Sequence, residues 1–192
     1  MKHKCINILV LILSVLLWSN CKRHSTPKPH GYFRITFPEK TYQTYHGPCP
    51  FTFEYPTYSD IRKDTSMRSE PCWYNIIFPR FNAEIHITYK PVHNNLPRIL
   101  EDTYELAYKH TVKADAIKET SFVNDSLKVY GILYDIIGNT ASNVQFYLTD
   151  STHHYIRGAL YFNLEPDKDS LNPVIRFLRK DIIHLVETFS WQ

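Results

Sequence analysis

The segment at residues 128–137 restricts the fold more than any other part of the chain, because it is apolar on both faces when read as a β-strand. Large apolar side chains would occupy both sides: Tyr130, Ile132, Tyr134 and Ile136 on one, and Val129, Leu133 and Ile137 on the other. A strand of this kind is typical of the interior of a sheet that is covered on both faces. We therefore expect a layered fold with this strand inside it.

The segments around it alternate between strand and helix signals. Strands are predicted at residues 32–37, 51–55, 73–78, 84–89, 116–123, 128–137, 143–149 and 153–162, and helices at residues 96–112 and 173–189. The short polar breaks between the last four strands suit hairpins, which predicts an antiparallel meander. The predicted fold class is α+β, a single antiparallel β-sheet sandwiched by helices. In its element order it resembles the Mog1 and PsbP-like α/β/α sandwiches.

The N-terminus has the form of an export signal. Lys2 and Lys4 precede a mainly apolar run at residues 6–18, and Cys21 follows shortly after it. That run is shorter than the roughly 17–25 residues that span a bilayer. We predict a lipoprotein signal peptide at residues 1–20, whose removal leaves Cys21 as a lipidated N-terminus that carries palmitate.

Two other interpretations of this N-terminus stay open: an uncleaved N-terminal anchor, and secretion without a lipid. Trp18 and Asn20 stand where aliphatic and small residues usually precede a lipidated cysteine. Residues 21–31 are basic and rich in proline, which predicts a semi-extended tether after the lipidated cysteine. Residues 32–192 are then expected to form a single globular domain.

The charge balance argues against a nucleic-acid partner. Removing residues 1–20 takes away two of the 22 Lys and Arg residues and none of the 19 Asp and Glu residues, which leaves a net charge of +1. A nucleic-acid-binding domain normally has a strongly basic surface. The chain also has only 5 glycines and no Gly-rich phosphate-binding motif, so no cofactor is expected.

Cys49 and Cys72 are the two cysteines that neither the leader nor the lipid anchor uses. In an oxidising compartment such a pair most simply forms a disulfide, which would tie down the polar loop before Cys72. In the chain-entropy model a loop of this length is worth about 3 kcal/mol. A redox site would need the spacing C-x-x-C, and a metal site would need paired Cys or His residues, which do not appear. No metal is therefore expected.

Few residues suggest catalysis. Asp135 lies in an apolar strand and could be a carboxylate with a perturbed pKa, or it could pair with a cation on a neighbouring strand such as Arg157. Ser142 lies at the expected hairpin tip of residues 138–142, where a polar side chain usually satisfies the backbone of its own turn. The histidines show no spacing typical of metal ligands. The chain is therefore not expected to be an enzyme.

Aromatic residues make up 15% of the chain. Tyrosine and tryptophan can form platforms for sugars, and Trp73 is the side chain to test for such a role. The same residues could instead fill the core of the sheet, or line a protein interface, where Tyr, Trp and Arg are enriched. We therefore predict a possible binding surface that includes Trp73, Asp135, Ser142 and Arg157.

Several strings of residues in the mature chain suggest a family. They are PKPHGYFRI at residues 27–35, CPFTFEYP at 49–56, PCWYNI at 71–76, AYKHTVKADAI at 107–117, VQFYLTDS at 144–151 and RGALYFN at 157–163. In these strings the chain resembles the gliding motility lipoprotein GldD family of Bacteroidota. The resemblance implies an envelope lipoprotein that is required for gliding, is associated with the type IX secretion machinery and has no known catalytic activity.

The residues after Cys21 indicate which side of the membrane the domain faces. Some Bacteroidota lipoproteins carry acidic residues there as a mark for surface export, whereas this chain has Lys22, Arg23 and His24. We therefore expect a periplasm-facing domain held by acylated Cys21 in the inner leaflet of the outer membrane. Its expected partners are the lipid bilayer and other envelope proteins of the gliding and secretion machinery, among which it would act in assembly or as a scaffold. The alternative is a peptidoglycan- or glycan-binding envelope module.

Overall fold

The structure is a computed structural model that describes residues 35–164 and 168–192. The predicted signal peptide at residues 1–20, the lipidated Cys21 and the tether at residues 21–31 lie outside the described residues. No helix in the described part of the chain combines the length and the apolar character that a membrane span requires.

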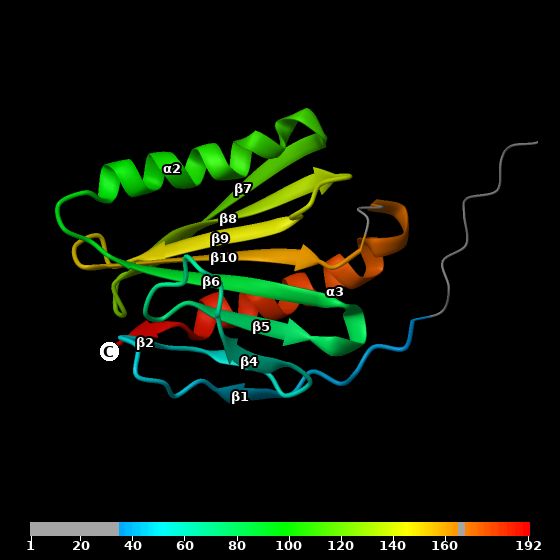
Figure 1. The fold of residues 1–192 in the computed structure, drawn as a ribbon, viewed down its shortest axis with the longest axis horizontal. Coiled ribbons are helices and arrows are strands. Elements are labelled where there is room, and N and C mark those ends of the chain that lie inside the picture. The colour runs from blue at the N-terminus through cyan, green and yellow to red at the C-terminus, as the bar shows by residue number, and fades with distance from the viewer. Residues whose placement is uncertain (1–34, 165–167) are drawn as a thin grey trace, which may run out of the picture. The chain divides into compact units, whose positions relative to one another are not determined.

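The largest element of the fold is a seven-stranded antiparallel sheet (Figure 1). Its strands, in spatial order, are β4 (Asp60–Lys63), β5 (Tyr74–Phe78), β6 (Ala83–Pro91), β10 (His154–Phe162), β9 (Val144–Thr149), β8 (Val129–Gly138) and β7 (Ala114–Asn124). The predicted meander is confirmed, because β7, β8, β9 and β10 are neighbours both in sequence and in the sheet. The chain passes from β6 to β7 through helix α2 (Leu96–Tyr108) and the 3-10 helix η2 (Lys109–Val112).

Two smaller sheets make the prediction of a single sheet wrong. β1 (Tyr42–Thr44) pairs with β3 (Glu54–Pro56), and β2 (Phe51–Thr52) pairs with β11 (Ser190–Trp191). The predicted strand at residues 51–55 is therefore divided at Phe53, and its two halves pair with different segments. With helix α3 (Lys168–Thr188) before β11 and the 3-10 helix η1 (Pro79–Phe81) between β5 and β6, the described residues form a mixed α/β fold with antiparallel sheets and two α-helices.

Two more predictions near the start of the domain are wrong. Residues 35–37, the described part of the predicted strand at 32–37, are not in a strand. Phe37 instead stacks on Phe177 of α3, with ring centroids 4.4 Å apart. Strand β4 lies within the segment that was expected to be a polar loop. Strand β4 forms through backbone pairing with β5. Ile61 is its only apolar residue, so no alternating apolar pattern marks this strand in the sequence.

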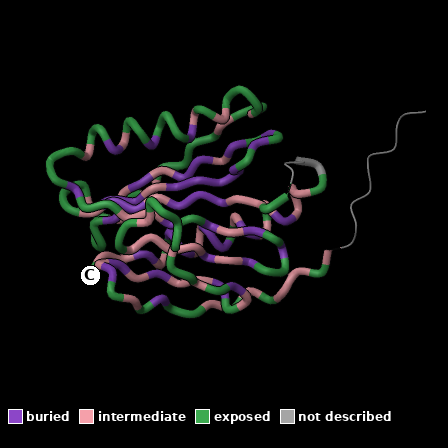
Figure 2. The backbone as a smooth tube through the Cα atoms, in the orientation of Figure 1, coloured by how far each residue is buried: buried purple, intermediate pink, exposed green. Residues whose placement is uncertain are grey.

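Helix α3 covers one face of the large sheet, which we call the α3 face. Its buried residues Leu178 and Ile182 belong to the same core cluster as Phe146 and Leu148 of β9. The inner strands are the most continuously buried part of the fold (Figure 2). Side chains of β9 alternate between the two faces, so Tyr147 points away from this core.

Helix α2 contacts the opposite face, which we call the α2 face. Ile99 packs in a cluster with Tyr155 of β10, and Ala107 packs in another with Tyr134 of β8. The buried residues of α2 recur every four positions, so one stripe of the helix is covered and the rest is largely exposed (Figure 2). Strand β8 thus lies inside the sheet with apolar contacts on both faces, as predicted.

Candidate functional site

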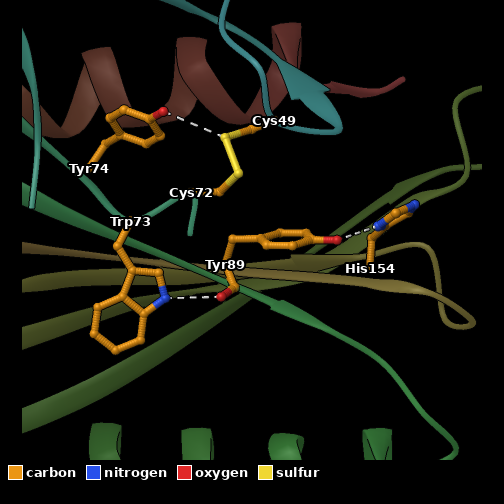
Figure 3. The surroundings of a disulfide bond; sticks show 6 residues. All are labelled: Cys49, Cys72, Trp73, Tyr74, Tyr89 and His154. Carbon is orange, nitrogen blue, oxygen red and sulfur yellow. Dashed lines mark hydrogen bonds between the residues drawn. A yellow bond between two sulfur atoms is a disulfide. The ribbon is translucent and has the colours of Figure 1, made fainter. Parts of the chain in front are cut away.

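The predicted disulfide between Cys49 and Cys72 is present (Figure 3). It joins the residue two positions before β2 to the residue two positions before β5, so it ties one of the small sheets to the large one. The Tyr74 hydroxyl donates a weak hydrogen bond to the Cys49 sulfur, with 3.6 Å between the two atoms. Cys49 is buried in the main core. The bridge therefore has the position of a structural disulfide and not of an exposed redox site.

Trp73 lies beside this disulfide, and one hydrogen bond holds its indole in place. Its Nε1 donates to the backbone carbonyl of Tyr89 at 3.0 Å, and the Tyr89 hydroxyl is hydrogen-bonded to Nδ1 of His154 at 2.8 Å (Figure 3). Trp73 as a residue is half-buried. Because Tyr74 packs against the main core on the α3 face, the preceding Trp73 belongs to the α2 face.

Asp135 forms an ion pair with Arg179 of α3. Two parallel hydrogen bonds join them, from Nε to Oδ1 at 2.5 Å and from Nη2 to Oδ2 at 2.7 Å. This bidentate geometry is the strongest form of such a pair, and hydrogen bonding to Asp135 raises the pKa of Arg179. The suggested pairing of Asp135 with Arg157 is wrong, because the two residues lie on opposite faces of the sheet.

Arg157 lies on the α2 face, where it is opposite Tyr147 of β9. Its guanidinium donates to the side-chain oxygen of Gln145 at 2.5 Å. The side-chain nitrogen of Gln145 is buried and has no hydrogen-bond partner among the described residues. Burial lowers the pKa of His110, and the nearby charge of Arg157 lowers it further. Arg157 therefore stands beside polar groups whose hydrogen-bonding capacity is not fully used.

Ser142 is buried and does not protrude from the tip of the hairpin. Its hydroxyl has no hydrogen-bond partner among the described residues. The turn is held by Asn143 instead, whose side-chain nitrogen donates to the backbone carbonyls of Ile136 and Gly138 at 3.0 and 3.1 Å. The suggestion that the Ser142 hydroxyl satisfies the backbone of its own turn is therefore wrong, because the Asn143 side chain does so.

The structure does not bring the four predicted surface residues together. Trp73 and Arg157 share the α2 face, Asp135 lies on the α3 face, and Ser142 is inside the protein. The prediction of one common surface failed for a physical reason. The sequence does not show on which face of the sheet a given side chain will lie, or which face each helix will cover.

A groove between α3 and the β7–β8 edge of the sheet is the most site-like feature of the described residues. Its larger hollow, about 470 Å³, is lined by Lys118, Asp135, Ile136, Ile137, Gly138, Asn143, Val144, Asn172, Ile175, Arg176 and Arg179. A smaller hollow of about 150 Å³ shares Arg179 and is lined mainly by apolar groups that include Phe122, Leu133 and Ile183. We call the two hollows together the α3–β7 groove.

The charge of the α3–β7 groove is positive. Lys118, Arg176 and Arg179 lie in its larger hollow with a single carboxylate, Asp135. Asp135 is engaged by Arg179, whereas Lys118 and Arg176 are exposed. Sequence reasoning missed these cations. Lys118 could have been found, because it stands directly opposite Asp135 in the predicted hairpin.

The described residues contain no group of three or more His, Cys, Asp and Glu side chains placed to hold a metal ion.

Comparison with known proteins identifies a family. The family model described as gliding motility lipoprotein GldD matches residues 22–191 of this chain. Among solved structures, the chain is similar to the solution structure of cyanobacterial PsbP (CyanoP) from Synechocystis sp. PCC 6803, with 9% sequence identity and a TM-score of 0.49, over 86% of this chain and 100% of that chain. No curated protein matches this chain at a significant level.

Proposed function

We propose, because this chain belongs to the family of the gliding motility lipoprotein GldD, that it is a non-enzymatic assembly component of the gliding and type IX secretion machinery. Membership in a lipoprotein family supports a membrane-anchored protein of the cell envelope. The proposal adds that the domain works by binding other envelope proteins while its lipid holds it at the membrane.

The observation that carries this proposal is the α3–β7 groove. It combines a cationic hollow of about 470 Å³ with an apolar hollow of about 150 Å³, and it lies beside exposed residues of β7. A mixture of apolar contact area with a few placed charges is what protein partners use for affinity and for orientation. The bidentate contact with Asp135 fixes the Arg179 side chain, so that part of the groove is already ordered before a partner binds.

The proposal also includes the anchor. Acylated Cys21, carrying palmitate, would hold the tether at residues 21–31, and a single domain from residue 32 to residue 192 would face the periplasm from the inner leaflet of the outer membrane. The basic Lys22 and Arg23 support this orientation, because anionic lipid head groups attract them.

Crosslinking in living cells, followed by mass spectrometry, tests the assembly role. We expect the wild-type protein to be trapped with envelope proteins of the gliding machinery, and we expect Arg176→Glu to weaken both trapping and gliding. Arg98→Glu is the matched control, since Arg98 is an exposed arginine on the other helix, α2. A wild-type protein that is recovered only as a partner-free monomer would count against the assembly role.

The absence of a catalytic function is part of the proposal and has its own test. Ser142 is the serine that sequence reasoning singled out, and its buried hydroxyl has no partner among the described residues. We expect cells that carry Ser142→Ala to glide as the wild type does. Loss of gliding with an unchanged amount of folded protein would contradict the non-enzymatic role.

A glycan-binding function is the second candidate, and the α2 face favours it. The half-buried Trp73 offers an aromatic ring there, and Arg157 and Gln145 offer polar groups on the same face. Aromatic rings and convergent polar groups are what a sugar site requires. Retention of the protein on purified peptidoglycan sacculi, and its loss in Trp73→Ala, would support this candidate, whereas no retention of the wild type would exclude it.

We further propose that α2 and α3 complete an α/β/α sandwich of the Mog1 and PsbP-like kind. The support is that α3 packs in one apolar cluster and α2 in two others, on the opposite face of the seven-stranded sheet.

A further inference from the structure

Strand β7 is a long strand at one edge of the large sheet. It has 11 residues, whereas β4 at the other edge has 4. In the described residues β7 is paired only with β8, so its outer edge has no strand beside it. Proteins usually keep free edges short, because a row of unpaired N–H and C=O groups is a template for a further strand.

The side chains of β7 divide between the two faces of the sheet. Lys118, Thr120 and Phe122 stand opposite Asp135, Leu133 and Gly131 of β8, and this set belongs to the α3 face. The other set includes Glu119, which accepts a hydrogen bond from the Tyr108 hydroxyl of α2 at 2.9 Å. A strand added beside β7 would therefore place every second side chain over the α3–β7 groove.

The groove offers that strand two different subsites. Near Lys118 the larger hollow is cationic, with Arg176 exposed across from it on α3. Near Phe122 the smaller hollow is mainly apolar. Its other wall, on α3, is formed by Ile183 and Val186 together with the charged residues Arg179 and Glu187. Lys118 and Phe122 are four residues apart on the same face, which corresponds to about 13 Å along a strand.

We propose that the edge of β7 accepts an extended segment of a partner protein as an eighth strand. This inference rests on the proposed assembly function and names the chemistry of the partner. The segment carries an acidic side chain that lies beside Lys118 and Arg176, and an apolar side chain, four residues away, that enters the hollow beside Phe122. Backbone hydrogen bonds supply affinity in such strand addition, and the alternate side chains supply specificity.

A second copy of this chain fits the edge less well. In a two-fold antiparallel pairing of two β7 strands, the central residue stands opposite its own copy. Pairing about the middle of the strand would therefore oppose two Glu119 residues, and pairing one residue earlier would oppose two Lys118 residues. Like charges directly across a strand pair are destabilising. The positive groove favours an acidic segment of a different protein.

Site-specific crosslinking in cells tests the proposal with the full lipoprotein. A photo-crosslinking amino acid is placed, one position at a time, at Thr120, Ser121 and Val123, and the attached partner residues are identified by mass spectrometry. All three positions are exposed. When the probe moves from Thr120 to Ser121 and then to Val123, we expect the attached partner residue to shift by one and then by two positions in a single direction. These partner residues should lie in a segment that has an acidic and an apolar residue four positions apart. The same amino acid at Arg62, on the opposite edge strand β4, is the control.

Two kinds of variant sharpen this test. Successive amides of β7 point alternately toward β8 and outward, so only one of Thr120→Pro and Ser121→Pro removes a hydrogen bond to β8. The other variant removes an amide that points outward, so it should keep the wild-type urea midpoint. We expect that variant to lose the crosslinks. Lys118→Gln removes the charge without placing a second carboxylate opposite Asp135, and it is expected to reduce the crosslinking yield about fivefold. Lys113→Gln, just before β7, should leave the yield unchanged.

The outcomes separate the two proposals. Crosslinks that scatter over several segments, or that recur every three or four residues as on a helix, would overturn strand addition. If partners are trapped in cells but none is attached through the β7 positions, the edge is excluded and the assembly role stands. If neither experiment traps a partner, both proposals fail.

Discussion

Asp181 of α3 connects three side chains from the early part of the described domain. It is 1% exposed and accepts hydrogen bonds from Lys40 Nζ at 2.6 Å, from the Tyr42 hydroxyl at 2.9 Å and from the Tyr58 hydroxyl at 2.6 Å. Burial lowers the pKa of Lys40, and the hydrogen bond to Asp181 opposes that shift. The cluster fastens the segment from Lys40 to Tyr42, together with Tyr58, onto α3.

We therefore predict that Asp181→Ala lowers the free energy of unfolding by about 3 kcal/mol, because it leaves a partly buried ammonium and two tyrosine hydroxyls without their acceptor. Urea unfolding followed by circular dichroism measures the effect. Asp60→Ala is the control, since Asp60 forms an exposed ion pair with Arg62 at 3.6 Å and its loss should cost less than about 0.5 kcal/mol. Equal effects of the two substitutions would show that the Asp181 cluster is not a fastening point.

Asp150 makes stability depend on pH. Burial alone would raise the pKa of its carboxyl, but the backbone N–H groups of Thr152, His153 and His154 donate to it and hold the pKa at about 2. The folded state thus has a lower pKa than the unfolded chain, whose value is about 3.9. The carboxylate therefore stabilises the fold fully above about pH 5, and this contribution is lost as the pH falls toward 2.

We expect Asp150→Asn to lower the free energy of unfolding by about 1 to 2 kcal/mol at pH 7, and by much less at pH 2. Urea midpoints at pH 7, 4 and 2 measure the difference between the two proteins, and Asp60→Asn controls for the loss of one negative charge. A difference that stays the same at all three pH values would contradict the role of Asp150.

At the scale of the elements, the disulfide links the segment before β2 to the segment before β5. Cys49 and Cys72 are 23 residues apart, and the loop between them contains β2, β3 and β4. Replacing both cysteines with serine should reduce the free energy of unfolding by about 3 kcal/mol, because the unfolded chain regains the freedom of that loop. Thermal unfolding of the double variant tests this, and added reductant should then lower the melting temperature of the wild type but not that of the variant.

Sequence patterns predicted the elements unequally well. The meander from β7 to β10 and the helix α3 were found, because alternation and a helical period are written in consecutive residues. β1, β4 and β11 were not predicted, since each has four residues or fewer and depends on a partner strand elsewhere. The division of residues 51–55 between two sheets was missed for the same reason: pairing with β1 and with β11 is a long-range event.

For the molecule as a whole, the lipid anchor should be separable from the fold. We predict that Cys21→Ala no longer incorporates labelled palmitate, moves from the membrane fraction to the soluble envelope fraction and does not support gliding. Its urea midpoint should equal that of the wild type, because Cys21 precedes the predicted domain at residues 32–192. Ser19→Ala, two residues earlier, is a control that should keep both label and location. A Cys21→Ala protein that is still labelled, or that supports gliding while soluble, would overturn the proposed anchor.

The sequence by itself determined the order of the main strands and helices, the pairing of Cys49 with Cys72 and the family. These features depend on local periodicity, short turns, the number of cysteines and characteristic strings of residues, all of which can be read along the chain. Only the tertiary structure decided that Asp135 pairs with Arg179, 44 residues away, and that Tyr42 bonds to Asp181, 139 residues away. It also decided that α3 leaves a groove beside β7. The reason is physical: which face of a strand a helix will cover is settled by the packing of the whole core, and no local pattern carries that information.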